Sequence, residues 1–266
     1  MHGHVVATER ITPAMVRVTL AGEGLSEFGS TDHTDAYINV AIPPIDATYD
    51  PPFDIEELRS QVPKDHRPVR RRYTVRRWDP VDRVLTVDVV VHAGKGVGGP
   101  WADAAEPGDA LVFSGPTGSY RPDPAVDWHL LVGDEAALPA IAASLEAAPA
   151  GAPVVVRLVC DGPDHMLELG TPGELDIAWL CRTGDRGDAD LLPAAVRDLT
   201  FLPGRVHAFV HGEAGEVREI RRHLLADRAL PRADLSASPY WRRHLTDEAW
   251  REIKPAWNAS VEHDVT

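Results

Sequence analysis

The spacing of apolar residues changes near the middle of this 266-residue chain, and this change constrains the fold more than any other feature. In the first half, apolar and polar residues alternate over short runs separated by Pro and Gly clusters, which is typical of half-buried strands. These runs are residues 15–20, 38–42, 85–91 and 111–113. They predict an antiparallel sandwich or barrel, with a polar excursion over 46–68 that holds one helical turn at 55–59.

In the second half, short continuous apolar runs alternate with helical patterns, which predicts a parallel sheet covered on both faces. The expected strands are 128–132, 154–160, 177–181 and 206–210, and the expected helices are 135–147, 188–199 and 213–226. The fold class is therefore an antiparallel β-barrel followed by an α/β domain with a parallel sheet. The predicted divisions are a barrel domain over 1–125, an α/β domain over 126–230 and a C-terminal extension over 231–266. In the extension we expect Thr246 to cap a short helix and the residues after Asn258 to form a frayed tail.

Composition excludes several classes of protein. The net charge of −14 argues against nucleic-acid binding, because phosphate contacts require an excess of basic residues. No run of about 18 apolar residues occurs, so no membrane insertion is expected. The first residues also lack a signal-peptide pattern. Cys160 and Cys181 lie in apolar runs without metal-ligand spacing, so we expect free buried thiols, no metal site and a reducing, cytoplasmic compartment.

An arginine-rich run at residues 70–77 is the first candidate binding element. On a strand, Arg72, Thr74 and Arg76 share one face. An arginine fork suits a pyrophosphate, and a threonine hydroxyl can bond a ring nitrogen. The alternative is a solvated edge strand whose arginines prevent aggregation.

A glycine-rich loop at residues 94–101 follows the Val-rich strand and His92. Its glycines let backbone amides approach an anion, and a helix starting near Trp101 would direct its positive end there. A flexible hairpin loop and a structural histidine are the alternatives.

Two strand–turn–helix segments, residues 130–141 and 209–214, and the C-terminal run 239–243 complete the candidates. Neither turn carries the G-x-G-x-x-G fingerprint, and the acidic residues Asp134 and Glu135 could simply cap the helix. The aromatic residues Tyr240 and Trp241 either pack structurally or cover a planar ligand.

Taken in order, these elements resemble the siderophore-interacting proteins, which are ferric-siderophore reductases among the ferredoxin-reductase-like flavoproteins. The resemblance extends from about residue 11 to 242. Its specific motifs are Arg72-Tyr73-Thr74-Val75-Arg76 and Gly133-Asp134-Glu135-Ala136-Ala137-Leu138-Pro139-Ala140-Ile141. Supporting matches are Trp179-Leu180-Cys181-Arg182, Gly212-Glu213-Ala214 and Tyr240-Trp241-Arg242.

The resemblance implies specific roles. Arg72 would hold the FAD pyrophosphate, Tyr73 would lie against the flavin or its ribityl chain, and Thr74 would reach flavin N5, so that Tyr73 and Thr74 are the catalytic candidates. The other expected FAD contacts are Val75, Arg76, Val90, His92, Gly96, Val97, Gly98, Gly99 and Trp101. The expected NAD(P)H contacts are Gly133, Asp134, Glu135, Ala136, Gly212 and Glu213, with Arg182 and Arg218 as candidates to meet a 2′-phosphate. The extension that carries Trp241 would return toward the flavin.

Three departures from the family pattern affect these assignments. Ala136 stands where the family usually has threonine, which removes a hydroxyl from the nicotinamide site. The loop at 96–99 lacks the usual serine, and Pro239 replaces a glycine before the Tyr-Trp-Arg motif.

The expected reaction is transfer of hydride from NAD(P)H to flavin, followed by single-electron reduction of Fe(III) in a siderophore and release of Fe(II). Because many ferric siderophores are anionic and this chain is acidic, substrate needs a local basic patch, for which Arg242, Arg243 and Lys254 are candidates. Alternatively, the two arginines pair with the nearby acids Asp247 and Glu248. The alternative functions are a flavin-dependent reductase of another acceptor, a reductase fed by ferredoxin, and a siderophore carrier with structural FAD.

Overall fold

The computed structural model describes residues 1–29, 31–91 and 96–265. The chain divides into two compact units between Ser119 and Tyr120, whereas the sequence suggested a boundary after residue 125. The intervening residues belong to the second unit because they bind its sheet. The Tyr120 ring packs 4.7 Å from His207 and 4.8 Å from Phe209, and the Asp123 backbone N–H donates to His207 Nδ1 at 3.2 Å.

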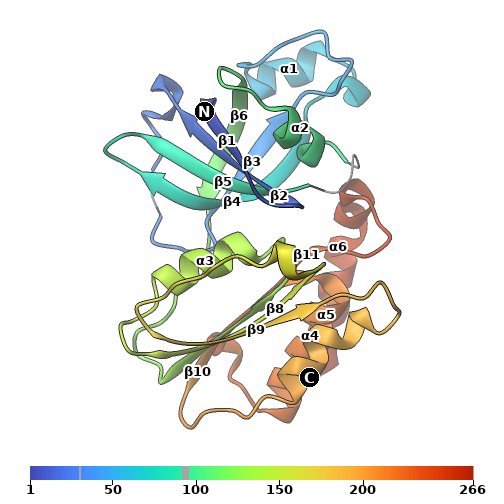
Figure 1. Ribbon diagram of the computed structural model, residues 1–266. Helices are drawn as coiled ribbons and strands as arrows, with labels where there is room; N and C mark the ends of the chain where they lie inside the picture. Colours follow the sequence, from blue (N-terminus) through green and yellow to red (C-terminus); the bar gives the residue numbers. More distant parts are fainter. Residues whose placement is uncertain (30, 92–95, 266) are drawn as a thin grey trace. The chain divides into compact units, whose positions relative to one another are not determined.

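The first unit is the predicted antiparallel barrel (Figure 1). Its strands are β1 (His2–Thr12), β2 (Met15–Ala21), β3 (Tyr37–Ile42), β4 (Val69–Asp79), β5 (Val84–Val90) and β6 (Ala110–Thr117). They close in the order β1-β2-β5-β4-β3-β6. The alternation seen in the sequence fills the interior, since Val18 of β2 pairs with Val87 of β5 and both are fully buried.

Two short α-helices lie in the connections between the barrel strands. Helix α1 (Ile55–Gln61) confirms the predicted helical turn, and Asp54 caps it by accepting from the backbone N–H groups of Glu56 and Glu57. Helix α2 (Gly98–Ala104) follows the glycine loop and begins at Gly98, earlier than the predicted start near Trp101.

The second unit contains a parallel sheet in the order β11-β10-β7-β8-β9. The strands are β7 (Trp128–Gly133), β8 (Pro153–Cys160), β9 (Glu174–Cys181), β10 (Val206–Glu213) and β11 (Leu235–Trp241). The chain proceeds from β7 outward to β9 and then crosses to β10. The strand order therefore reverses between β7 and β10, the position where open α/β sheets bind ligands.

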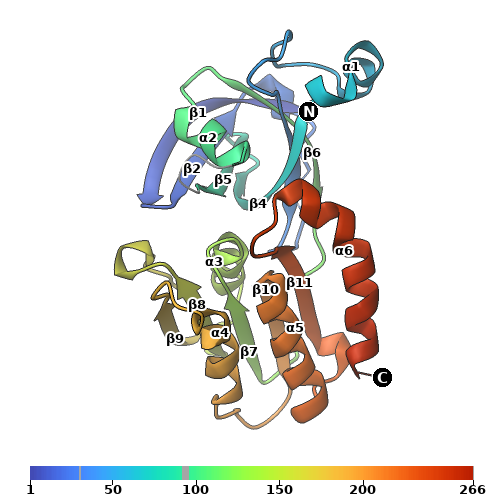
Figure 2. The ribbon, with the colours of Figure 1, turned by 90° about the vertical axis from the view of Figure 1, so that its right-hand side faces the viewer.

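Four helices flank this sheet in the described chain: α3 (Leu138–Glu146), α4 (Asp188–Arg197), α5 (Ala214–Arg222) and α6 (Asp247–Glu262). Helices α4 and α5 lie side by side on one face (Figure 2), where Val196 and Ile220 belong to one buried cluster with Leu130 and Val132 of β7. Helix α3 covers the other face, because a Cβ built on Gly133 would lie 2.6 Å from the Cβ of Ala137 at the start of that helix. A π-helical turn, His223–Asp227, continues from α5.

The C-terminal extension differs from its prediction. It belongs to the second unit and forms the edge strand β11 and the long helix α6. Thr246 caps α6 as expected, but the helix runs through Glu262 rather than fraying after Asn258. Its end is anchored because Val261 is buried and its carbonyl accepts from Arg221 at 2.9 Å. The predicted return of this segment toward the flavin remains a prediction.

None of the helices in the described ranges combines the length and the apolar character needed to cross a membrane.

Candidate functional site

Strand β4 carries Arg72 and Thr74 on the side that faces away from the barrel core, where Arg72 is exposed and Thr74 is buried. Tyr73 and Val75 pack against the barrel core, so the residues that alternate with them point outward. Arg72 is exposed, with its guanidinium carbon 5.3 Å from the centre of the Tyr37 ring, while Thr74 is 7% exposed. A guanidinium and a hydroxyl on one face can bind a phosphate and a ring nitrogen of the same ligand.

The third arginine of the predicted face is held differently. A β-bulge interrupts the β4–β5 pairing between Val75 and Arg77, and Arg76 Nε lies 3.9 Å from a carboxylate oxygen of Asp88. Asp88 also accepts two hydrogen bonds from Arg17, at 2.7 and 2.9 Å. Arg76 therefore belongs to an ion-pair cluster, whereas Arg72 lies over an aromatic ring.

The glycine loop meets β4 at Gly98. A Cβ built on Gly98 would lie 1.8 Å from Tyr73 Oη, so only glycine allows α2 to approach the strand this closely. Val97 and Trp101, on either side, pack against the barrel core. The turn therefore lies against the side of β4 that carries Arg71 and Tyr73, whereas Arg72 and Thr74 point to the other side. The exposed guanidinium of Arg72 fits the diphosphate part of FAD.

For the remaining residues predicted to bind FAD, the structure gives exposure or strand pairing but no contact that bears on FAD binding. Gly96 is exposed, with a φ of 76°, and Gly99 is buried. Val90 is the last residue of β5 and pairs with Met15. His92 lies outside the residues that the structure describes, so its role stays a prediction.

We expect Gly98→Ala to weaken FAD binding, because the new Cβ must displace the Tyr73 hydroxyl. Tyr73→Phe removes that hydroxyl and leaves Cζ 3.1 Å from the added atom, so the double variant should regain part of the FAD content. The measurement is the FAD-to-protein absorbance ratio after gel filtration. Gly29→Ala is the control, since a Cβ at that position has nothing within 4 Å. Full FAD content in Gly98→Ala would contradict the contact.

In the second unit, the predicted dinucleotide residues meet at the carboxyl end of the sheet, where His211 of β10 pairs with Gly133 of β7. Asp134, 1% exposed, accepts from Trp241 Nε1 at 2.7 Å and from the Ala136 backbone N–H at 2.9 Å. Gly212, at φ 142°, leaves room for this carboxylate, because a Cβ there would lie 2.7 Å from Asp134 Oδ2. Asp134 thus fastens β11 to the β7 turn. Burial raises its pKa to about 6.

Glu135 joins a second network at the same edge. Arg182 donates to both Glu135 oxygens, at 2.6 and 3.0 Å, and to Asp161 at 2.7 Å. Arg182 is predicted from the sequence to meet the 2′-phosphate of NADPH, and such a phosphate would have to compete with two carboxylates. The second candidate, Arg218, is likewise bound to Asp264 at 2.6 and 2.7 Å.

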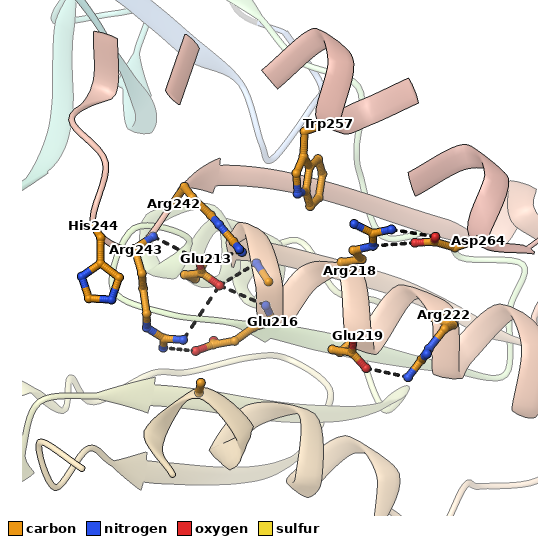
Figure 3. Close-up of a pocket in the computed structure, with 12 residues that line it drawn as sticks. Glu213, Glu216, Arg218, Glu219, Arg222, Arg242, Arg243, His244, Trp257 and Asp264 are labelled. Atoms are coloured by element: carbon orange, nitrogen blue, oxygen red, sulfur yellow. Dashed lines mark hydrogen bonds and ion pairs between the residues drawn. The ribbon is translucent and has the colours of Figure 1, made fainter. Parts of the chain in front are cut away.

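A cavity of about 710 Å³ opens beside the start of α5 (Figure 3). Glu213 caps α5 by accepting from the backbone N–H groups of Gly215 and Glu216, at 2.6 and 3.1 Å. It also accepts from the Arg243 backbone N–H at 3.1 Å and lies 3.4 Å from Arg242 Nη1. The cavity wall carries basic groups paired with acids, as Figure 3 shows for Arg243 with Glu216 and for Arg218 with Asp264.

Glu216 is the functional candidate that the sequence did not reveal. It is 2% exposed, one oxygen is bound by Arg243, and Oε2 has no hydrogen-bond partner among the described residues. Burial, together with the nearby charge of Asp134, raises the pKa of Glu216 to about 7, against the opposing effect of Arg243. Glu216 follows the capping Glu213 by three residues, which predicts that it lies in the first turn of a helix. Nothing in the sequence indicates that its side chain is buried.

The predicted substrate residues do not form a single patch in this unit. Arg242 and Arg243 line the cavity, each beside a carboxylate. Their carboxylate partners are Glu213 and Glu216, which come from the β10–α5 turn rather than from the start of α6. Lys254 is not in the cavity wall, and its ammonium donates to the Pro239 carbonyl at 2.6 Å.

Comparisons with known proteins find relatives that match over most of the chain. Residues 4–120 match the model of the siderophore-interacting FAD-binding domain, and residues 126–244 match that of the siderophore-interacting protein. The ferric vibriobactin reductase of Vibrio cholerae is 34% identical over 252 residues, covering 93% of this chain and 91% of the relative. The NADPH-dependent ferric-chelate reductase of Escherichia coli is 31% identical over 246 residues, covering 89% and 91%. The crystal structure of a siderophore utilization protein from T. fusca superimposes with a TM-score of 0.80 at 35% identity, covering 93% and 94%.

Proposed function

Because the chain belongs to the siderophore-interacting protein family, we propose that it is an FAD-dependent reductase that uses NAD(P)H to release iron from ferric siderophores as Fe(II). The observation that carries this proposal is strand β4, which carries Arg72 and Thr74 on one side and meets the Gly98 turn through Tyr73 on the other. The names of the Vibrio cholerae and Escherichia coli relatives, both reductases of ferric chelates, support it.

In this proposal the barrel holds FAD. Arg72 binds the pyrophosphate, Thr74 donates to or accepts from the flavin N5 position, and the Gly98 turn contacts the rest of the FAD. When bound, FAD can accept two electrons together from a donor and pass them on one at a time. Fe(II) binds hard oxygen ligands less tightly than Fe(III), so reduction loosens the chelate.

The second unit then serves the electron donor. The strand ends around Gly133 and Gly212 provide a site for NAD(P)H at the point where the strand order reverses. Asp134 already accepts hydrogen bonds from Trp241 and from the backbone of the turn, so we assign it a structural role in this site. Glu135 and Ala136 are assigned positions nearer the ligand. Arg242, at the cavity rim, is assigned to the anionic siderophore.

The test is an anaerobic absorption spectrum of the FAD-loaded protein before and after NADPH or NADH. We expect the flavin band to bleach with at least one donor. A band that persists with both donors but bleaches with reduced ferredoxin would overturn the nicotinamide assignment, and a band that persists with all three would favour a carrier with structural FAD.

Restoring the missing hydroxyl should improve the donor site. We expect Ala136→Thr to speed anaerobic flavin reduction by NADH, NADPH or both, measured by stopped flow. Reduction by dithionite is the control, because it does not need a nicotinamide site and should be unchanged. Identical rates for parent and variant with both nicotinamides would place the site elsewhere.

The charge at the cavity rim should affect substrate encounter. We expect Arg242→Gln to slow reduction of an anionic ferric siderophore at low salt, with the difference shrinking as ionic strength rises. Arg197→Gln on α4 is the matched control, since Arg197 has a similar side-chain exposure, 43% against 40%, but is not in the cavity wall. Arg243 is left intact because it donates a hydrogen bond to the buried Glu216. Equal rates for Arg242→Gln and the parent at low salt would remove Arg242 from the substrate site.

A further inference from the structure

The two cysteines of the chain end neighbouring strands directly opposite one another. Cys160 is the last residue of β8, Cys181 is the last residue of β9, and the parallel register pairs them. Register partners in a parallel pair direct their side chains to the same face of the sheet. Both thiols are free; Cys160 is fully buried and Cys181 is half-buried.

The sulfurs are close enough to interact. Burial, with a smaller contribution from the neighbouring Cys181, raises the pKa of Cys160 to about 11. The Cys160 thiol also donates to the Gly162 carbonyl at 3.3 Å. Register partners on neighbouring strands lie about 4.7–4.9 Å apart, within the Cα separation of about 4.4–6.8 Å that disulfides span.

These strand ends also carry the Arg182 network. The Arg182 backbone N–H donates to the Cys160 carbonyl at 2.8 Å, and its side chain binds Glu135 and Asp161. Arg182 directly follows Cys181, and Asp161 directly follows Cys160. A bond between the sulfurs would therefore act on the residues that hold Glu135 at the β7–α3 turn.

We propose that Cys160 and Cys181 are a reversible dithiol–disulfide pair, oxidised by hydrogen peroxide, that controls the position of Arg182 at the dinucleotide site. The half-buried Cys181 thiolate attacks one peroxide oxygen, which breaks the O–O bond, forms a sulfenic acid and releases hydroxide. The Cys160 sulfur then displaces hydroxide from that sulfenic acid. Overall, the two thiols lose two electrons and two protons, and one peroxide becomes two waters.

The link to catalysis rests on the proposed function. Reduced flavin and Fe(II) both react with dioxygen, and peroxide is a product of that chemistry. In a reducing compartment a disulfide is transient, which suits a response that is reversed by cellular dithiols. Oxidation would then slow electron entry while peroxide is abundant.

The first experiment tests the disulfide itself and does not depend on enzyme activity. The FAD-loaded protein is treated with hydrogen peroxide, and its thiols and intact mass are measured after denaturation. We expect both thiols to disappear with the loss of two hydrogen atoms, and dithiothreitol to restore them. In Cys160→Ser, dimedone should trap a sulfenic acid at Cys181, whereas in Cys181→Ser the buried Cys160 should remain a thiol. Two intact thiols in the parent, or an intermolecular disulfide, would overturn the proposal.

The second experiment tests the control of the donor site. Anaerobic flavin reduction by NADPH and NADH is compared for reduced and oxidised protein, and we expect a several-fold slower rate after oxidation that dithiothreitol reverses. The Cys160→Ala, Cys181→Ala double variant should not respond to peroxide. A disulfide that forms without changing these rates would overturn the regulatory part. If neither nicotinamide reduces the flavin in the reduced protein, the proposed function fails, while the mass measurement still decides whether the disulfide forms.

Discussion

Arg72→Ala is expected to weaken FAD binding roughly 10- to 100-fold, because a charge-assisted hydrogen bond to a phosphate contributes about 1.5–3 kcal/mol. Arg72 is exposed on the outer face of β4, where it lies over the Tyr37 ring, so its removal leaves the barrel core intact. The dissociation constant, measured by titrating apoprotein with FAD, gives the effect directly.

Arg77→Ala is the matched control for this prediction. Arg77 is exposed on the same strand, beyond the bulge at Val75. The variant carries the same change in charge, so a loss of FAD in both variants would indicate a general electrostatic effect. Unchanged FAD affinity in Arg72→Ala would refute the assignment of the pyrophosphate to this residue.

The second large effect concerns the pH dependence of stability and comes from Glu216. Its pKa rises from 4.5 to about 7 on folding, mainly because the side chain is buried. Between these values the folded state binds more protons than the unfolded state, so the free energy of unfolding falls as pH rises through this range and is constant above it. At about 1.4 kcal/mol per pKa unit, the fall attributable to Glu216 is about 3 kcal/mol.

Glu216→Gln should lack this contribution, because an amide does not ionise and can still accept from Arg243. Chemical denaturation at several pH values from about 4.5 to 8 should show the variant gaining stability relative to the parent as pH rises. Asp134 contributes its own slope below about pH 6, and because its charge also raises the pKa of Glu216, the two proteins are compared above pH 6. Glu219→Gln, on the same helix but exposed, is the control. Parallel pH profiles for the parent and Glu216→Gln would contradict the buried, protonated Glu216.

The sequence predicted the fold best where the buried face of an element produces a regular pattern of apolar residues. The alternation of β2 and β5 and the apolar runs of β7 and β8 follow directly from which faces are buried. Strand β11 shows no such pattern, because most residues of its Leu-Ser-Ala-Ser-Pro-Tyr-Trp sequence are small or polar. Its Pro239 is compatible with an edge strand. Its position depends on pairing with β10 and on the bond between Trp241 and Asp134, neither of which is local in sequence.

In the candidate site, too, local features could be predicted from the sequence and tertiary contacts could not. Gly98, Gly133 and Gly212 stand out in the sequence because tight turns and close backbone approaches need glycine, and the structure gives each a steric reason. The charge pairing could not be predicted, since Arg243 and Glu216 are brought together by tertiary packing. Arg242 and Arg243, which the sequence suggested as a basic patch, are therefore paired with Glu213 and Glu216.

The most direct test of the central claim is the fate of the electrons in a single turnover. The FAD-loaded protein is reduced anaerobically with one equivalent of NADPH or NADH and mixed with a ferric siderophore in the presence of a ferrous chelator. We predict that the flavin band returns while the coloured ferrous complex forms in proportion, both at rates that depend on siderophore concentration. A flavin that stays reduced, or one that reoxidises without Fe(II) appearing, would contradict a ferric-siderophore reductase.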